Sequence, residues 1–487
     1  MTITHDEHDE LIRKKICFEC IGDDHLSALA TKDGKKSRCQ YCGEKNKSVT
    51  LEYLSDHIEK AFKIHFTRTP DEPDSMQYAM LKDRESTYDW YREGQESAYA
   101  IMDAANLREN IAIDIQSILE FRHEDWDSAA AGIECEFASD AHYEEIMPGD
   151  HEWHEQWDEF ERLIKTEARF FSRTAAAHLS RLFDDIDQMK TRDEGTLVVD
   201  AGPDTALSHL YRGRVFQAEQ PLLKAMKRPD LELSAPPPWA AGAGRMNARG
   251  ISAFYGATSP EIALAEVRPP VGSRVALAKF DIKRPLRLLD LAALGKVLER
   301  GSIFDPDYAY RLGRMTFLAT LSERMAQPVM PDDQDMEYLP TQAIADFLST
   351  EGKVPLDGIL FASVQVGGNG LNVVLFHKSS RSEKLDLAKG THISARTYSV
   401  YADGAEADYG VIEEVPPTGS DKDDKKQDLT PFDLAMLDEG DHYSDPRDVT
   451  LKIDLESVHV HEISAVKIES QGHAVSRFRF EGGDTEF

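Results

Sequence analysis

Four of the five cysteines lie within the first 42 residues and form two CxxC pairs, CFEC with Cys17 and Cys20, and CQYC with Cys39 and Cys42. Each pair offers two thiolates on one tight turn, and the two turns together supply the four sulfur ligands of a tetrahedral zinc site. Four protein ligands leave no position for water, so the pattern predicts structural zinc. The fifth cysteine, Cys135, has no such partner and is expected to be a buried bystander.

A chain of 487 residues is long enough for several domains, because single hydrophobic cores stop growing near roughly 250–300 residues. Residues 1–50 are expected to form the zinc-knuckle segment. Residues 51–195 have a helical pattern, with segments LEYLSDHIEKAF and ANLRENIAIDIQSIL and an apolar stripe that runs from Trp157 to Ile186 in steps of three and four. We therefore predict an α-helical domain after the knuckle.

Beyond residue 205 the apolar period changes to that of strands and short helices. The predicted strands are ISAFYGA, SRVALAKFDI, LRLLDL, DGILFASVQV and LNVVLFH, and the predicted helices are YRLGRMTFLATLSERM and TQAIADFLST. Gly367, Gly368, Asn369 and Gly370 join the last two strands and predict a hairpin. Residues 205–395 are thus expected to form an α+β domain.

The last part of the chain changes character twice. Residues 402–440 are polar, charged and poor in aliphatic side chains, so we expect a disordered or loosely held linker there. Strand-like alternation returns in VTLKIDLESVHVHEISAVKI, which predicts a C-terminal β-strand segment over 441–487.

Charge is spread unevenly along the chain. The formal net charge is −32, yet residues 205–395 contain 23 Lys plus Arg against 20 Asp plus Glu. A near-neutral, arginine-bearing segment within an acidic chain suits a small anionic ligand better than nucleic acid. No apolar run approaches the roughly 20 residues of a membrane span, and the N-terminus has no apolar signal core, so a soluble cytoplasmic protein is expected.

The segment GRMNARGISAFYGATSPEIALAEVRPP, residues 244–270, places Tyr255 on a strand and Glu266 on a short helix. Ser259 is a good N-cap for that helix, which must end before Pro269. Glu266 then lies in the last turn, where the helix dipole disfavours a carboxylate. Such a position invites a functional explanation, although a surface carboxylate would explain the spacing equally well.

Other polar residues mean little when taken alone. Ser363 is predicted in the middle of the strand DGILFASVQ, where serine commonly bonds to backbone. Arg212 and Arg214 in LYRGR have the pattern of surface arginines. The order LYRGR, GRMNARGISAFYGATSPEIALAEVR, YLPTQAIADFL, DGILFASVQ and NVVLF, however, resembles the RES domain, named for its arginine, glutamate and serine, over roughly residues 205–380.

The resemblance implies a fold similar to ADP-ribosyltransferases and an activity that destroys NAD. The family's arginine falls on Arg212, with Arg214 left open as the alternative, its tyrosine on Tyr255, its glutamate on Glu266 and its serine on Ser363. The helical half, through the cysteine pairs and the helix WDEFERLIKTEARFF, is similar to the HEPN-type domain that precedes RES in some long bacterial proteins.

These residue types suit cleavage of the bond between nicotinamide and ribose. That reaction generates an oxocarbenium-like centre, which the Glu266 carboxylate could stabilise. Arg212, with Arg245 as a second candidate, could bind the pyrophosphate, and Tyr255 could stack on nicotinamide or bond the ribose. Ser363 could hold Glu266 or the substrate in place.

The acceptor stays open between water, phosphate and a protein side chain, which correspond to a glycohydrolase, a phosphorylase and an ADP-ribosyltransferase. An enzyme that drains NAD is toxic to its own cell, so we expect a toxin or phage-defence effector that is restrained by an antitoxin or another regulatory protein. The sequence leaves open whether the chain forms a homo-oligomer.

Two other classes of function compete with this interpretation. Arg173 and His178 have the spacing of a HEPN-type ribonuclease motif, but five helical residues place them about 140° apart, and His178 borders the apolar stripe, so a packed histidine is favoured. A non-catalytic interaction protein is the other alternative.

Overall fold

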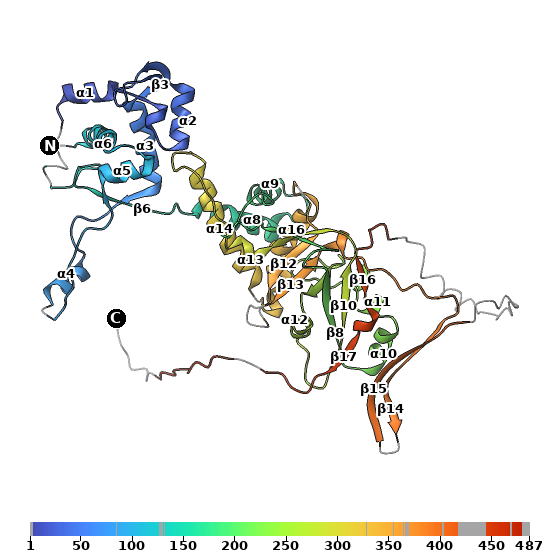
Figure 1. The fold of residues 1–487 in the computed structure, drawn as a ribbon. Coiled ribbons are helices and arrows are strands. Elements are labelled where there is room, and N and C mark those ends of the chain that lie inside the picture. The colour runs from blue at the N-terminus through green and yellow to red at the C-terminus, as the bar shows by residue number, and fades with distance from the viewer. Residues whose placement is uncertain are drawn as a thin grey trace. The chain divides into compact units, whose positions relative to one another are not determined.

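The computed structural model describes residues 3–83, 85–125, 130, 132–327, 329–353, 355–363, 365, 370–401, 404–416, 445–467 and 470–479. It divides into two compact units, one of residues 1–197 with 292–325, the other of residues 198–291 with 326–487. Figure 1 shows helices and sheets in both units, so the chain is a multidomain α+β protein. The domain limits expected from the sequence stay predictions.

The first unit contains helices and two small sheets. Its three-stranded sheets have the orders β1-β3-β2 and β4-β6-β5. The helices are α1 (His5–Arg13), α2 (Asp24–Asp33), α3 (Leu51–His65), α4 (Ser75–Lys82), α5 (Ser97–Ala105), α6 (Glu109–His123), α8 (His151–Arg162), α9 (Arg173–Leu182) and α14 (Tyr308–Ala326, in this unit to Met325). The strands are β1 (Lys15–Cys17), β2 (Lys35–Arg38), β3 (Lys45–Thr50), β4 (Phe66–Arg68), β5 (Gln95–Glu96) and β6 (His142–Glu145).

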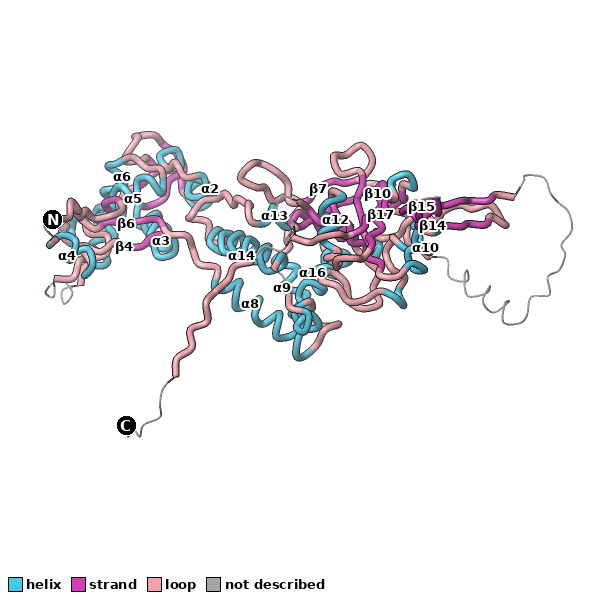
Figure 2. The backbone as a smooth tube through the Cα atoms, turned by 90° about the horizontal axis from the view of Figure 1, so that it is seen from below, coloured by secondary structure: helices cyan, strands magenta, loops and turns pink. Residues whose placement is uncertain are grey.

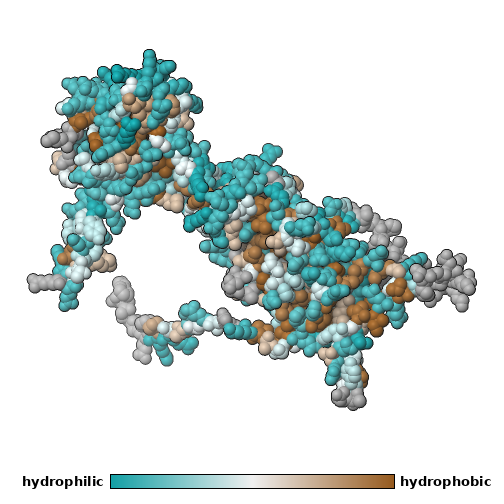
Figure 3. Space-filling model, viewed as in Figure 1, coloured by the Kyte–Doolittle hydropathy of each residue, from teal (hydrophilic) through white to brown (hydrophobic). Residues whose placement is uncertain are grey.

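The core of the first unit joins the cysteine-bearing sheet to α3 and α6. Ile16 of β1, Ile58 of α3 and Ile115 of α6 are all fully buried in one cluster. In the view of Figure 3, hydrophilic residues cover most of the visible surface of this unit, as the acidic composition of the chain outside residues 205–395 leads one to expect.

The apolar stripe from Trp157 to Ile186 does not form one helix. A π-helical turn (Leu163–Glu167) follows α8, and Ser172 then caps the separate helix α9 by accepting a hydrogen bond from the Ala175 amide. Phe171, which the stripe placed on the buried face, is 96% exposed in the intervening loop. The period alone could not reveal the break, because the residues after it resume the same spacing.

The second unit is built on one nine-stranded sheet in the order β16-β10-β8-β9-β13-β12-β11-β7, with β17 also pairing with β10. All pairs are antiparallel except β11 with β12. The strands of the unit are β7 (Val198–Ala201), β8 (His209–Phe216), β9 (Phe254–Ala257), β10 (Arg274–Ile282), β11 (Leu286–Asp290), β12 (Gly358–Ala362), β13 (Leu371–Leu375), β14 (His392–Tyr401), β15 (Gly404–Glu414), β16 (Leu451–Ile453) and β17 (His459–Glu462).

Helices cover both faces of this sheet, whose strands are magenta in Figure 2. Leu222 of α10 and Leu233 share one core with Phe254 and Phe280, whereas Ile262 of α12 packs in a separate cluster on the other face. The helices of this unit are α10 (Glu219–Lys227), α11 (Pro229–Glu232), α12 (Pro260–Glu266), α15 (Gln334–Glu337) and α16 (Leu339–Thr350), while α13 (Leu291–Leu294) falls at the boundary, with residues 292–294 in the first unit.

Two strand predictions need correction in length. The strand expected over ISAFYGA is confined to β9, and Ser363, expected in the middle of a strand, lies one residue beyond the end of β12. The hairpin expected after β12 is consistent with the antiparallel pairing of β12 and β13, but its residues 367–369 lie outside the described residues.

The segment expected to be a linker differs from the prediction in its first part. Residues Gly404–Glu414 form β15, which pairs with β14 in a two-stranded hairpin that projects from the unit in Figure 1. Residues 417–444 lie outside the described part of the chain. The chain then returns to the sheet as β16 and β17, which confirms the strand alternation seen in the C-terminal sequence.

Candidate active site

A pocket opens where the sheet of the second unit divides. β8 pairs with β10 over eight residues, from His209 to Phe216, but with β9 only through Tyr211 and Ala257. The pocket of 230 Å³ that forms there is lined by residues of β8, β9, α12 and its C-cap, β12 and β13. They are Tyr211, Arg212, Gly213, Tyr255, Gly256, Ala257, Ala263, Glu266, Val267, Phe361, Asn372 and Val373. The pocket therefore reaches residues of both β8 and β9 where these strands are paired through one residue pair.

Local sequence delivers Glu266 to this pocket. The Ser259 hydroxyl caps α12 by accepting a hydrogen bond from the Ile262 amide at 3.4 Å, and Pro260 occupies the first helical position. Glu266 is the last residue of the helix, and Arg268 beyond it has a left-handed φ of 45° ahead of two prolines. The predicted cap, first turn and end of this helix are therefore confirmed.

Two buried side chains hold one oxygen of the half-buried Glu266. Oε1 accepts hydrogen bonds from the Ser363 hydroxyl at 2.6 Å and from the Asn372 side-chain amide at 2.7 Å. Ser363 and Asn372 are 1% and 5% exposed. A carboxylate that accepts two short hydrogen bonds has a defined orientation, so Glu266 is not a freely rotating surface side chain.

Asn372 is the functional candidate that sequence reasoning missed. It stands in the apolar strand LNVVLF, where an asparagine has low strand propensity and where Val373, Val374 and Leu375 are fully buried. A polar residue inside such a run was the available signal, but its partner lies 106 positions earlier in the chain.

Arg212 bridges the division of the sheet. Its Nη1 donates to the Tyr255 carbonyl of β9 at 2.8 Å, and its guanidinium lies 5.1 Å from the centre of the Phe254 ring. Burial, assisted by the nearby charge of Arg214, lowers the pKa of Arg212 to about 10, so the side chain keeps its charge at neutral pH. The Arg212 side chain therefore links β8 to β9 in addition to the single pair of residues through which the two strands are joined.

The Tyr255 hydroxyl is already engaged within the protein. It donates to Asn247 Oδ1 at 2.6 Å and accepts from the Met246 amide at 3.1 Å, and burial raises its pKa to about 12. A Cβ on Gly244 would lie 2.5 Å from this hydroxyl, which explains why glycine stands there. Tyr255 also lines the pocket, with its hydroxyl held by one donated and one accepted hydrogen bond.

Two predicted arginines lie outside the pocket lining. Arg214 is exposed and forms an ion pair with Glu232 at 3.0 Å. Arg245 donates to the Gln327 carbonyl at 2.7 Å and lies 6.0 Å from the Tyr338 ring centre. The structure therefore gathers Arg212, Tyr255, Glu266 and Ser363, and leaves Arg214 and Arg245 outside.

The four N-terminal cysteines form a compact cluster, with all sulfur atoms within 4.8 Å of one another. Sγ–Sγ distances are 3.7 Å for Cys17 with Cys20, 3.5 Å for Cys17 with Cys42, and 3.9 Å for Cys20 with Cys39. Zinc–sulfur bonds of about 2.3 Å in a tetrahedron require edges of about 3.8 Å. The donor set therefore fits a tetrahedral metal.

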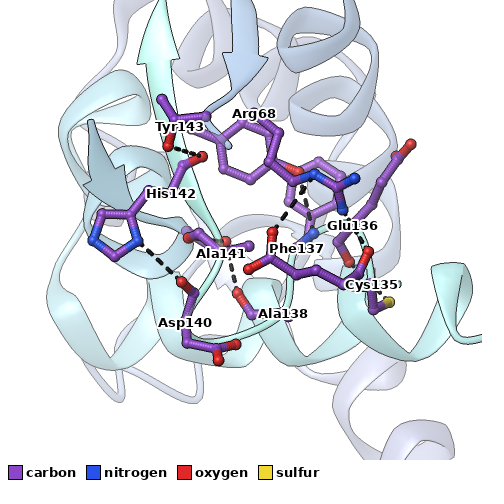
Figure 4. Close-up of polar contacts among 12 residues, drawn as sticks. Arg68, Cys135, Glu136, Phe137, Ala138, Asp140, Ala141, His142 and Tyr143 are labelled. Carbon is purple, nitrogen blue, oxygen red and sulfur yellow. Dashed lines mark hydrogen bonds and ion pairs between the residues drawn. The ribbon is translucent and has the colours of Figure 1, made fainter. Parts of the chain in front are cut away.

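Cys135 lies apart from that cluster, in the loop between α6 and β6 that Figure 4 shows. Its thiol donates to the Glu136 carbonyl at 3.2 Å, and the side chain is partly exposed. Burial and neighbouring carboxylates raise the pKa of this thiol to about 11. Cys135 is thus half-buried rather than buried, and its thiol stays protonated at neutral pH.

His178 is packed in an aromatic core. It is 2% exposed, its ring lies 5.6 Å from the Phe160 ring and 6.1 Å from the Trp157 ring, and neither ring nitrogen has a hydrogen-bond partner among the described residues. Burial lowers the pKa of His178 to about 4, and the charge of Arg181 acts in the same direction. Arg173 begins the same helix, α9. The packed position favours a core histidine over a ribonuclease residue.

Comparison with known proteins agrees with the resemblance seen in the sequence. Residues 223–397 match the family model of the RES domain. The chain therefore contains a RES domain, and Tyr255, Glu266, Ser363 and Asn372 lie within the matched residues, whereas Arg212 precedes them. The comparisons with curated proteins and with solved structures find no match. Among the described residues, no helix is both long and apolar enough to cross a membrane.

Proposed function

We propose that the pocket of the second unit cleaves the bond between nicotinamide and ribose in NAD. The observation that carries the proposal is the Glu266 carboxylate, which lines a pocket while one of its oxygens is held by two donors. A carboxylate fixed before the substrate arrives stabilises a developing positive charge without the cost of reorientation. RES domains are associated with NAD and with toxin systems, which supports the same substrate.

The chemistry needs little from the protein beyond this charge. As the C1′–N bond breaks, nicotinamide leaves as a neutral molecule with both bonding electrons, and the ribose becomes an oxocarbenium-like cation beside Glu266. Water then adds to C1′ and loses a proton, which yields ADP-ribose. If phosphate adds instead, the products are nicotinamide and ADP-ribose 1″-phosphate.

Arg212 and Tyr255 serve binding in this proposal. The guanidinium of Arg212 is the cation among the residues that line the pocket, and it suits an anionic phosphate. The ring of Tyr255 offers a face for stacking on nicotinamide, because its hydroxyl is engaged elsewhere. Ser363 holds Glu266 rather than the substrate.

The first test is an NMR time course of the purified full-length protein with NAD, with and without phosphate. We expect nicotinamide release, and Glu266→Gln should slow it at least about 100-fold, the usual effect of losing one transition-state electrostatic contact. Glu261→Gln is the matched control, because Glu261 is an exposed carboxylate in the first turn of the same helix. Equal rates for both variants would refute the assignment of Glu266.

The same experiment separates the acceptors. Phosphate-dependent release would identify a phosphorylase, phosphate-independent release a glycohydrolase, and transfer of label to protein an ADP-ribosyltransferase, which is also the fold class that the RES resemblance implies. Expression that depletes cellular NAD and stops growth would support a toxin or defence effector under the control of an inhibitory partner.

We also propose that the four-cysteine cluster binds zinc as a structural element. The sulfur spacing and the absence of a free coordination position support this role. Elemental analysis should find about one zinc per chain, and Cys17→Ser together with Cys42→Ser should abolish it. Full metal content in the double variant would contradict the assignment.

A further inference from the structure

The two hydrogen bonds to Glu266 converge on one of its oxygens. Both the Ser363 hydroxyl and the Asn372 amide donate to Oε1. Of the two carboxylate oxygens, Oε2 is therefore the one not engaged by this pair of donors. Because Glu266 and Asn372 both line the pocket, the arrangement sets which oxygen of the carboxylate meets a ligand.

The strand positions explain why Asn372 can hold Glu266 firmly. Asn372 lies on β13 between two strands, opposite Phe361 of β12 and Ala257 of β9. Its backbone is fixed on both sides by the sheet, so only the side-chain torsions need ordering. Burial of an amide group is costly unless its hydrogen bonds are made, and Glu266 supplies the acceptor.

We propose that Asn372 is the positioning residue of the reaction: with Ser363 it clamps Oε1 of Glu266 so that Oε2 faces the reacting ribose. This inference rests on the proposed NAD cleavage for its catalytic meaning. Asn372 acts through Glu266 and makes no contact with the reacting atoms. It lies outside the arginine, glutamate and serine for which the RES domain is named, although it begins the NVVLF segment that contributes to the resemblance.

The clamp also matters electrostatically. A carboxylate in place of the Asn372 amide would lie at hydrogen-bond distance from the carboxylate at position 266, and two such carboxylates share one proton. The other titratable side chains that line the pocket are Tyr211, Arg212 and Tyr255. A substitution at position 372 leaves these three side chains in place. A shift in the pH dependence of the rate would therefore come from the two carboxylates at positions 266 and 372.

The decisive variant is Asn372→Asp, which keeps the shape of the side chain and replaces its N–H donor with an oxygen. At pH 7 we expect nicotinamide release to fall at least about tenfold. The acidic limb of the pH–rate profile should move upward by at least about one pH unit, with part of the activity regained at alkaline pH. Activity and a pH profile unchanged from the parent would overturn the proposal.

Asn372→Ala provides a second measurement that does not depend on a new charge. Its kcat should fall about 10-fold to 100-fold while KM stays within about threefold, because the lost contact orients the carboxylate and does not bind NAD. A rise in KM with an unchanged kcat would place Asn372 in substrate binding and overturn the positioning role.

Val374→Ala is the matched structural control. Val374 is fully buried two residues along the same strand and lies outside the pocket lining. This variant should lower thermal stability and leave the pH–rate profile in place. A profile displaced equally in Val374→Ala and Asn372→Asp would show a general effect of strand damage and would count against the clamp.

Thermal unfolding between pH 5 and pH 8 tests the clamp without reference to activity. The paired carboxylates of Asn372→Asp should lower Tm more at pH 8 than at pH 5, because the pair loses its shared proton as pH rises. A pH-dependent deficit in a protein that does not cleave NAD would retain the clamp and reject the proposed function. A deficit that is the same at every pH would reject the clamp itself.

Discussion

Glu266 shows how much the meaning of one side chain depends on its partners. Glu266 is a carboxylate at the C-terminal end of its helix, where the helix dipole disfavours negative charge. This unfavourable position is the sequence feature that indicates a functional role. The contacts of Ser363 and Asn372 offset that cost by donating to it. A residue that is placed against its local preference and then held by two buried donors fits a functional site better than a surface position.

Tyr255→Phe should distinguish the role of the Tyr255 hydroxyl from the role of its ring. Loss of the hydroxyl removes its bonds to Asn247 and Met246 and should lower the free energy of unfolding by about 1–2 kcal/mol. Nicotinamide release should stay within about tenfold of the parent, because the ring is retained. Tyr255→Ala, which removes the ring, should reduce release much further, and equal losses in both variants would argue for a direct role of the hydroxyl.

The buried imidazole of His178 predicts an acid-sensitive first unit. Its pKa of about 4 in the folded state lies below the ordinary value of 6.5, so the folded state binds fewer protons than the unfolded state at intermediate pH. Stability should therefore fall as pH drops from about 6.5 to about 4 and level off below that. The change from this residue is on the order of 3 kcal/mol.

His178→Leu tests whether His178 causes this loss of stability at low pH, since leucine keeps the apolar packing against Phe160 and Trp157. Chemical denaturation across this pH range should show a flatter profile for His178→Leu than for the parent. Parallel profiles would locate the acid sensitivity in other groups.

Among the secondary-structure elements, the division between β8 and β9 is what creates the pocket. A single residue pair joins the two strands, and the Arg212 side chain donates across the gap to the Tyr255 carbonyl. The helix α12 then brings Glu266 to the same opening. An uninterrupted ladder of backbone hydrogen bonds would have closed this space.

Arg212→Lys tests whether the bridge needs more than a positive charge. Lysine keeps the charge but loses the planar set of donors, which can reach a carbonyl and a phosphate at once. We expect kcat/KM for NAD to fall at least about tenfold, measured by nicotinamide release. Arg214→Lys is the control, because Arg214 lies outside the pocket lining and pairs with Glu232. Its kinetics should match those of the parent.

For the molecule as a whole, metal binding should stabilise the folded first unit and should not affect the stability of the second. Cys17, Cys20 and Cys39, three of the four cysteines, belong to the same buried cluster as residues of α3 and α6, so removal of a structural metal should loosen that core. After treatment with a chelator, limited proteolysis should cut first within the first unit, residues 1–197 with 292–325, while fragments of the second unit, residues 198–291 with 326–487, survive. Simultaneous cleavage of both units would contradict independent stability.

Sequence determined the features that depend on neighbours in the chain. The spacing of the two CxxC pairs, the Ser259 cap, the proline stop after Glu266 and the alternation of the sheet strands each follow from short-range geometry, and the structure contains them. The RES order of motifs belongs to the same class of information, and the family match confirms it.

Tertiary structure alone decided which of these residues meet. Asn372 and Glu266 are 106 positions apart, and no local pattern records a contact over that distance. The break within the Trp157–Ile186 stripe and the strand β15 inside the expected linker depend on packing that period and composition do not encode. Arg212 and Arg214 are both arginines on β8, and the sequence does not distinguish them. In the folded chain Arg212 donates to the Tyr255 carbonyl of β9 at the pocket, whereas Arg214 forms an ion pair with Glu232.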